Sequence, residues 1–374
     1  MERHAGVSDP HTPFPGSYAD GDIDFLLTPV TSEEAAAISE APADKERLIQ
    51  RGVRHYSQMI TPEHAPSPAY QAIFDHALDR HAERTGRDLA ALVRALDERL
   101  DGPITLCSLV RAGVPPGVAL TRGLRALGRD VAHYGLSIVR DRGIDAIALR
   151  HVLQHRPAAG TVFVDGWTGK GAISDELEHT LADGWPDLAP RLVVLADPAG
   201  RAWLAASEED WLIPSGLLGG TVSGLVSRSI LNERLSSPDQ FHASVRLDHL
   251  AEHDVSRAFV DRICVPMQQA LSADPAALPP ITSGAPAARA RATAVIDTIA
   301  DEFGIDNRNR IKPGLAEATR AVLRRAPARI LVGGADDDDL DALRHLATAA
   351  SVPIDSRGAT LHPYRAITLI ADAS

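Results

Sequence analysis

GTVFVDGWTGKGA, residues 160–172, is the stretch of this 374-residue sequence around which the rest of the chain is organised. Four mostly β-branched residues, 161–164, lead to Asp165, a glycine-rich turn follows, and residues 172–181 have the composition of a helix. This order predicts a buried parallel strand, a phosphate-sized loop and a helix N-terminus. Glycines let backbone N–H groups approach an anion, and a helix start adds free donors and a positive dipole. Asp165 can then accept hydrogen bonds from ribose hydroxyls beside the phosphate.

The loop differs from two common phosphate loops. A Walker A loop needs a glycine five residues before Gly169, where this chain has Val164, and the Gly-x-Gly-x-x-Gly spacing is absent from the stretch. The chain has only three lysines, Lys45, Lys170 and Lys312, so a lysine kept inside the glycine loop favours a tight anion site. The alternative is an ordinary strand–turn–helix in which the glycines serve only the turn.

Strands and helices alternate around this loop, which predicts an α/β parallel sheet flanked by helices. Strands are expected at 104–110, 131–139, 161–165 and 191–196, and helices at 114–127, 144–154 and 172–183. Ligands bind at the carboxyl ends of such strands, where the loops 111–113, 140–143 and 165–171 should share one face. Two of these loops are basic, so together they predict a clamp for a polyphosphate. Taken alone, residues 140–142 could equally be a solvated charge cluster.

The flanking segments carry weaker signals. Residues 1–66 are expected to be an extension packed on the core, with 54–59 interpreted as a packing loop in slight preference to a hood over substrate. Residues 67–100 predict two helices broken near Gly86. Residues 211–232, apolar but rich in glycine and serine, predict either a buried helix or a lid over the substrate base.

A second, smaller unit follows the region 67–270. Residues 271–292 are rich in proline and alanine and predict a linker. Beyond it, helices are expected at 294–303, 314–325 and 340–350, and strands at 329–332, 352–354 and 366–370. This pattern predicts a compact α/β/α module over residues 293–374. The four acids at 336–339 suit the start of a helix better than a metal site.

Composition limits the function classes. Hydrophobic content of 44% and charged content of 24% are ordinary for a globular protein, and a net charge of −12 argues against a general nucleic-acid coat. Cys107 and Cys264 have no pairing motif, which suits a reducing compartment. The histidines of residues 240–265 lack metal-ligand spacing. We expect a cytoplasmic protein, since residues 1–17 lack an apolar signal core and no run is long enough to span a bilayer.

These residues resemble a named family. Residues 12–265 look like the phosphoribosyltransferase family of bacterial tellurium-resistance (Ter) stress operons, some members of which carry the name cysteine protease StiP. The resemblance rests on 16–18, 24–27, 55–57, 108–117, 133–134, 137–145, 162–173, 221–228 and 254–261. The run 164–173 is the most specific part. Residues 293–371 are similar to the Pelota RNA-binding fold, through IKPGLAEAT at 311–319.

The resemblance implies a type I phosphoribosyltransferase core that uses phosphoribosyl pyrophosphate (PRPP), with Mg²⁺ as counter-ion. The PRPP-binding residues it implies are Ala112, Gly113, Asp165, Gly166, Thr168, Gly169, Lys170 and Gly171. Residues 168–171 would hold the 5′-phosphate, Asp165 the ribose hydroxyls, and 111–113 the pyrophosphate. The catalytic residues would be Asp165, Arg111, Arg140 and Arg142, the last two on a mobile loop. Loops of that family carry two adjacent acids, whereas here Val164 precedes Asp165.

The C-terminal resemblance implies RNA contact by Lys312, Gly314 and Glu317. Kink-turn binders usually have asparagine before the glutamate, and this chain has Ala316 there.

Three functions follow from these patterns. The first is phosphoribosyl transfer from PRPP to an unidentified base, in either direction, as part of a stress response. The second is a non-catalytic sensor of nucleotides or RNA. The third is a cysteine protease. Cys107, in mid-strand between Leu106 and Ser108, and Cys264, between Ile263 and Val265, are both expected to be buried, inert thiols. A membrane partner is not expected, and a homodimer is left open.

Overall fold

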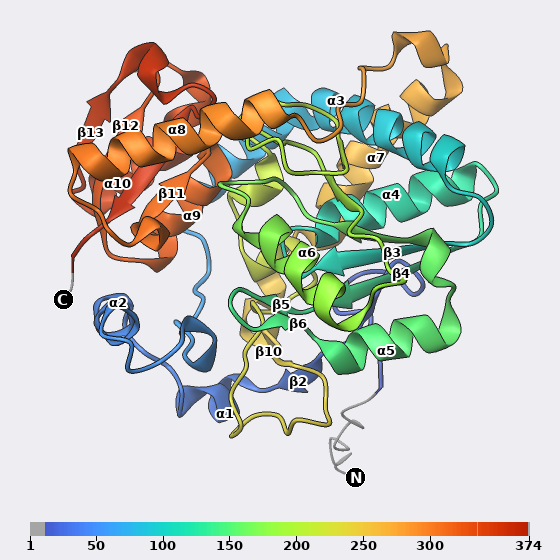
Figure 1. The fold of residues 1–374 in the computed structure, drawn as a ribbon, viewed down its shortest axis with the longest axis horizontal. Coiled ribbons are helices and arrows are strands. Elements are labelled where there is room, and N and C mark those ends of the chain that lie inside the picture. The colour runs from blue at the N-terminus through green and yellow to red at the C-terminus, as the bar shows by residue number, and fades with distance from the viewer. Residues whose placement is uncertain (1–11, 335, 373–374) are drawn as a thin grey trace.

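The computed structural model describes residues 12–334 and 336–372, and its larger part is a parallel sheet covered by helices on both faces (Figure 1). The six strands run in the order β1-β4-β3-β7-β8-β9, and every neighbouring pair is parallel. Their bounds are β1 Asp24–Phe25, β4 Val131–Leu136, β3 Ile104–Leu109, β7 Thr161–Val164, β8 Leu192–Val194 and β9 Leu204–Ala205. The predicted α/β parallel sheet is therefore confirmed.

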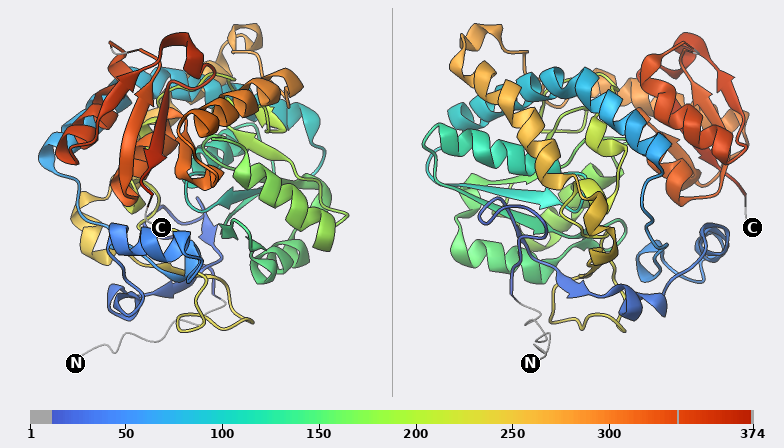
Figure 2. Two further views of the ribbon diagram at one scale, coloured as in Figure 1. Left: turned by 60° about the vertical axis from the view of Figure 1, so that its left-hand side comes forward. Right: turned by 180° about the vertical axis from the view of Figure 1, so that it is seen from behind.

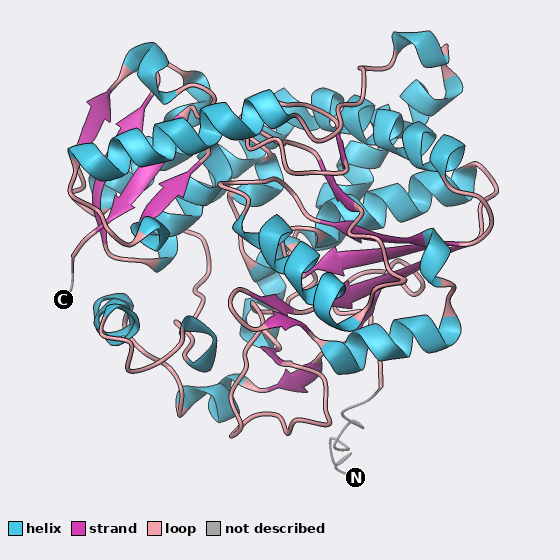
Figure 3. Cartoon of the chain, viewed as in Figure 1, coloured by secondary structure: helices cyan, strands magenta, loops and turns pink. Residues whose placement is uncertain are grey.

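Alternation along the strands sorts side chains to two faces. Leu106 and Val162 belong to the core formed with α3 (Pro68–Arg99), α4 (Val114–Ala126) and α7 (Ser256–Ser272). Cys107 and Phe163, the next residue in each strand, belong to the core formed with α5 (Ala146–His155) and α6 (Ala172–Gly184). Figure 3 shows the helices on both sides of the strands.

The predicted break near Gly86 is wrong, because α3 is one continuous 32-residue helix. Gly86 marks a close helix crossing: a Cβ there would lie 2.6 Å from the Pro266 ring and 2.9 Å from the carbonyl oxygen of Ile263, both on α7. Residues 211–232 form no α-helix either. They contain 3₁₀ turns at Pro214–Gly216 and Gly220–Val222, and most of their side chains are buried.

The N-terminal extension does more than pack on the core, because its strand β1 joins the edge of the sheet beside β4. A second strand, β2 (Thr28–Val30), pairs with β10 (Ala243–Val245), and two short helices follow, α1 (Ser32–Ala36) and α2 (Pro42–Gln50). A further hairpin, β5 (Ile138–Val139) with β6 (Gly143–Ile144), replaces the end of the strand expected at 131–139.

The C-terminal module has its own four-stranded sheet, in the order β11-β14-β12-β13. Its strands are β11 Ile311–Pro313, β12 Pro327–Val332, β13 Ile354–Ser356 and β14 Ala366–Ile370, and its helices are α8 Pro286–Glu302, α9 Leu315–Arg324 and α10 Asp341–Ala349. Helix α8 begins inside the segment expected to be a linker, since Pro286 fits the first helical position. None of the described helices is long and apolar enough to cross a membrane.

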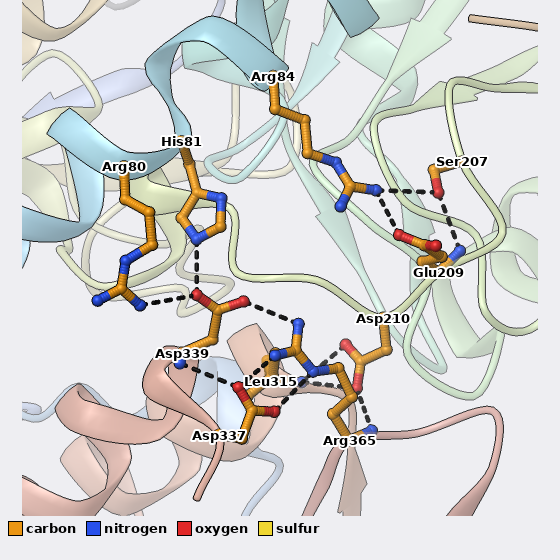
Figure 4. A network of polar contacts seen from close by, with 10 residues as sticks. All are labelled: Arg80, His81, Arg84, Ser207, Glu209, Asp210, Leu315, Asp337, Asp339 and Arg365. Carbon is orange, nitrogen blue, oxygen red and sulfur yellow. Dashed lines mark hydrogen bonds and ion pairs between the residues drawn. The ribbon is translucent and has the colours of Figure 1, made fainter.

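The module lies over the carboxyl ends of the main sheet, and the reverse view in Figure 2 shows it beside α3. Figure 4 shows the polar network that holds it there. Asp339 accepts a hydrogen bond from His81 Nε2 at 2.6 Å and from Arg365 Nη1 at 2.8 Å. Asp337 caps the turn before α10, so the acids at 336–339 start a helix as predicted.

Candidate phosphate-binding site

A cavity of about 330 Å³ lies where the strand-end loops, the C-terminal module and the N-terminal extension meet. All three predicted loops contribute to it, which confirms that they share one face. Nine cationic and two acidic side chains line the described part of the wall: Lys45, Arg111, Arg140, Lys170, Arg228, Lys312, Arg320, Arg324, Arg325, Asp165 and Glu317. Such a wall fits a ligand with several negative charges.

Asp165 stands at the end of β7 and is the acid nearest in sequence to the glycine loop. Its Oδ1 accepts a hydrogen bond from the Gly166 N–H at 2.8 Å, and its Oδ2 has no hydrogen bond to another described residue. Burial raises the pKa of Asp165 to about 7. The carboxylate therefore has one oxygen available for a ligand hydroxyl or a cation.

The glycine loop is fixed by hydrogen bonds to Asp197, an acid that was not predicted from the sequence. Thr168 Oγ1 donates to Asp197 Oδ1 at 2.5 Å, and Asp197 also accepts the backbone N–H groups of Arg201 and Ala202, at 2.9 and 2.8 Å. The Thr168 hydroxyl proton is thus committed to Asp197 rather than to a ligand. Gly171 then forms the N-cap of α6, and the first three residues of that helix line the cavity.

The C-terminal module packs directly on this loop. Lys170 Nζ donates to the carbonyl oxygen of Arg308, and Tyr364 donates its hydroxyl to the Gly169 carbonyl oxygen at 3.0 Å. Burial, with the charges of Lys312 and Arg140, lowers the pKa of Lys170 to about 7. The lysine is therefore only partly protonated near neutral pH until an anion reaches it.

Arg111, in the predicted pyrophosphate loop, is 4% exposed and reaches into the cavity. Its Nη1 donates to the Val226 carbonyl oxygen at 2.8 Å, its Nη2 lies 2.7 Å from Glu63 Oε1, and its Nε has no partner. Burial opposes the ionisation of Glu63, but the charges of Arg111 and Arg324, together with hydrogen bonds from Arg111 and the Gly220 N–H, outweigh burial and lower the pKa of Glu63 to about 2. Glu63, from the N-terminal extension, is a second acid that sequence reasoning missed.

Gly113 allows the pyrophosphate loop to touch the end of β7. A Cβ at residue 113 would lie 1.9 Å from the carbonyl oxygen of Val164. Ala112 meanwhile lies against Gly166, whose own Cβ would be 3.2 Å from the Ala112 carbonyl oxygen. The two predicted binding loops are therefore in backbone contact.

Only one of the two arginines in the third loop, residues 140–143, lines the cavity. Arg140 lines the cavity and its guanidinium lies 5.4 Å from the centre of the Tyr56 ring, but Arg142 is exposed and does not line it. Glu176 on α6 accepts the N–H groups of Asp141 and Gly143 at 2.6 and 2.7 Å. The loop is thus anchored at both sides of Arg142.

Residues 54–59 turn out to combine two of the expected roles. Tyr56 is half-buried and lines the cavity, and its hydroxyl accepts the N–H of Arg140 at 2.8 Å. Arg228 lies on the same ring at 5.5 Å. The interpretation as a packing loop alone is therefore incomplete.

The residues expected to contact RNA face inward in this structure. Lys312 is 7% exposed and lines the cavity with Glu317, whose Oε1 lies 3.6 Å from Lys312 Nζ. Burial lowers the pKa of Lys312 to about 8. Gly314 does not line the cavity. It precedes α9, whose first N–H, that of Leu315, is accepted by Asp210 of the main domain at 2.9 Å.

Both cysteines are remote from this chemistry. Cys107 is 0% exposed and Cys264 is 5% exposed, and neither lines the cavity. Burial raises the pKa of Cys264 to about 11 and raises that of Cys107 even further. Among the described residues, no histidine makes a hydrogen bond or ion pair with either thiol.

The family model described as tellurite-like stress resistance cysteine protease StiP matches residues 16–264. The chain belongs to this StiP family. It is 44% identical over 373 residues to the cysteine protease StiP of Acinetobacter baylyi, covering 96% of this chain and 94% of that protein. The family model described as PELOTA RNA binding domain matches residues 290–372. The predicted family and C-terminal module are thereby confirmed.

Solved structures similar to this StiP-family chain include two phosphoribosyltransferases. The hypoxanthine phosphoribosyltransferase of Trypanosoma cruzi is 15% identical, with a TM-score of 0.26 and coverage of 44% of this chain and 93% of that one. The enzyme of Leishmania tarentolae in complex with GMP is 17% identical, with a TM-score of 0.25 and coverage of 36% and 74%.

Proposed function

We propose that this protein is a phosphoribosyltransferase that takes PRPP, with Mg²⁺, as its donor substrate. The observation that carries the proposal is the convergence of the glycine loop, the Arg111 loop and Arg140 on one cationic cavity. PRPP combines a monophosphate, a ribose and a pyrophosphate, and this cavity offers a separate group of residues to each. The resemblance of residues 164–173 to PRPP loops points to the same ligand.

The chain's own residues would act by positioning and by charge. The N–H groups of residues 168–171 and the Lys170 ammonium would bind the 5′-phosphate, as helix N-termini commonly do. Asp165 would orient the ribose through its hydroxyls. Arg111 and Arg140 would stabilise the negative charge that develops on the leaving pyrophosphate as the glycosidic bond breaks.

The donor set is compatible with Mg²⁺. This cation binds enzymes through one or two carboxylates and otherwise through substrate phosphates and water, and Asp165 Oδ2 supplies one such carboxylate oxygen. When bound, Mg²⁺ would neutralise pyrophosphate charge. Its affinity for Asp165 would also favour the ionised carboxylate, which burial alone disfavours.

The protease function named for the Acinetobacter relative is not supported by the cysteines of this chain. A cysteine nucleophile must be an accessible thiolate beside a base, whereas both thiols here are buried with raised pKa values. The match to the Pelota model does favour one second candidate, RNA binding by the C-terminal module. Binding of structured RNA to the full chain, measured by gel retardation, would support it.

Calorimetric titration of PRPP with Mg²⁺ into the protein tests the main proposal. We expect saturable binding that Asp165→Asn and Lys170→Ala each weaken by about tenfold or more, since each removes a charged contact. The matched control is Asp175→Asn, which alters an exposed acid on α6 that pairs with Arg201. Absence of binding to the unmodified protein would overturn the transferase proposal, and pyrophosphate release on adding a base would extend it.

A further inference from the structure

The wall of the cavity opposite the sheet carries more positive charge than PRPP accounts for. The donor's groups are assigned above to residues 111–113, 140 and 165–171. Arg320 and Arg324 from α9, and Lys45 from α2, line the same cavity without any role in that assignment.

None of these three cations forms an ion pair with another described residue. Arg324 makes no hydrogen bond or ion pair with another described residue, and Arg320 donates only Nε, to the Gly216 carbonyl oxygen at 3.3 Å, while its guanidinium lies 4.7 Å from the Trp167 ring centre. Lys45 is 7% exposed and also has no acidic side chain within ion-pair distance among the described residues. The neighbouring acids pair with other cations: Glu46 binds Arg325 at 2.8 Å, Glu63 binds Arg111 at 2.7 Å, and Glu317, whose charge also acts on Arg320 and Arg324, lies 3.6 Å from Lys312.

Burying cations together in this way opposes folding unless an anion joins them. Burial, together with the charges of neighbouring cations, lowers the pKa of Arg320 to about 9, of Arg324 to about 10 and of Lys45 to about 6, although the charges of Glu317, Glu63 and Glu46 act in the opposite direction. In Arg324 the next contribution comes from Arg111, and in Arg320 it comes from Arg324, so these groups lie within electrostatic range of the pyrophosphate loop. The arrangement suits a site that is completed by its ligand.

From this placement we propose that Lys45, Arg320 and Arg324 form a subsite for an acidic group, a carboxylate or a phosphate, carried by the acceptor base. The inference rests on the proposed transferase function and specifies its acceptor class. It also assigns a role to the C-terminal module: α9 supplies the acceptor side of the active site from within the same chain. Trp167, which lines the cavity under Arg320, places an aromatic surface beside this subsite.

The test is a second titration, into protein already saturated with PRPP and Mg²⁺. The probes are orotate, which carries a carboxylate, uracil, which has the same ring without it, and inorganic phosphate. We expect orotate or phosphate to bind at least about tenfold more tightly than uracil, as charge-assisted contacts do. Binding by orotate alone identifies the carboxylate source, and binding by phosphate alone identifies the phosphate source.

Arg324→Gln and Lys45→Met should each weaken binding of the favoured anion by about tenfold, with less than about threefold change in the affinity for PRPP. Arg344→Gln, on α10 and paired with Asp341 away from the cavity, is the matched control. Equal binding of anion by the wild type and both variants, or no binding of either anion, would overturn the acceptor subsite. Failure of PRPP itself to bind would instead overturn the transferase proposal, so the two failures are distinct.

Discussion

The two walls of the cavity are built in different ways. The sheet wall consists of backbone: strand ends, glycines in contact across neighbouring loops, and the start of α6. The opposite wall consists of long cationic side chains that reach in from α2, β11 and α9. In the first wall the backbones of neighbouring loops approach so closely that a Cβ at Gly113 would lie 1.9 Å from the Val164 carbonyl oxygen. The second is held in place by contacts between segments far apart in sequence.

We infer from this difference that the two walls select different features of a ligand. Backbone N–H groups carry no net charge when the site is empty, whereas Lys45, Arg320 and Arg324 of the second wall have lowered pKa values and form no ion pair with another described residue. In the proposed function, the sheet wall determines where the 5′-phosphate binds. The second wall gains stability from a ligand, so it should respond most strongly to the ligand's charge.

The largest effect is expected from breaking the backbone wall at Gly113. Gly113→Ala forces a Cβ to within 1.9 Å of the Val164 carbonyl oxygen, so the two binding loops must separate. We expect a loss of about 3 kcal/mol in the free energy of unfolding, and loss of measurable PRPP binding, by denaturation and calorimetry. Gly184→Ala, where a Cβ meets no atom within 4 Å, is the control. Normal PRPP affinity in Gly113→Ala would show that contact between the loops is not needed.

At Lys170, removing the charge should make the folded protein more stable and its binding of PRPP weaker. Lys170→Met removes a buried ammonium whose pKa falls to about 7, so the unfolded state binds this proton more tightly than the folded state. The wild type therefore loses stability as pH falls. The free energy of unfolding of the variant should exceed that of the wild type by about 1–3 kcal/mol at pH 6, and by less at pH 9.

Chemical denaturation at the two pH values, without ligand, measures this difference. PRPP affinity of Lys170→Met should fall by about tenfold or more at pH 6. A variant less stable than the wild type at both pH values would mean that the hydrogen bond to the Arg308 carbonyl oxygen outweighs the cost of burying the charge.

A moderate effect is expected at the junction that positions the second wall. Asp210 accepts the N–H of Leu315 at 2.9 Å and of Arg365 at 2.7 Å, and thereby caps α9 from the main domain. Asp210→Ala should cost about 1–2 kcal/mol in unfolding free energy, as loss of a helix cap does. Affinity for an acidic acceptor should fall more than affinity for PRPP.

The neighbouring exposed acid provides the control for that junction. Glu209→Gln removes only a surface pair with Arg84, so it should change stability by less than about 0.5 kcal/mol. If Asp210→Ala weakened the binding of PRPP and of the acceptor equally, the position of the sheet wall would also depend on this junction, contrary to our expectation.

The smallest effect on activity is expected at the cysteines. The double variant Cys107→Ala, Cys264→Ala should retain PRPP binding and turnover within about twofold, since neither thiol touches the cavity. Its unfolding free energy should fall by about 1–2 kcal/mol, because two buried sulfur atoms leave small cavities. Loss of activity without loss of folded protein would favour the protease function over the proposed transferase function.

The sequence predicted the sheet wall well because its signals are local. The strand at 161–164, the turn after it and the helix from residue 172 are consecutive, and the rule that parallel strands present their carboxyl ends together brought in 111–113 and 140. The helix break predicted near Gly86 was wrong, because the sequence does not distinguish a glycine that ends a helix from one that lets a neighbouring helix pack closely. Arg142 was grouped with Arg140 although the short β5–β6 hairpin turns it to solvent.

The residues that the sequence did not reveal owe their positions to contacts between distant segments. Glu63 reaches Arg111 from 48 residues earlier in the chain, and Asp210 caps a helix whose first turn is 105 residues later. Only the spacing of Glu317, Arg320 and Arg324 along one face of a helix could have hinted at a shared surface.

The sequence by itself determined the parallel sheet, the glycine loop and the family, because strand periodicity and a contiguous motif do not depend on what packs around them. The tertiary structure alone decided that the face of the C-terminal module expected to meet RNA meets the phosphate loop instead. The physical reason is that a cation's partner, and hence its burial and pKa, depends on which segments the fold brings together, and no local pattern encodes that.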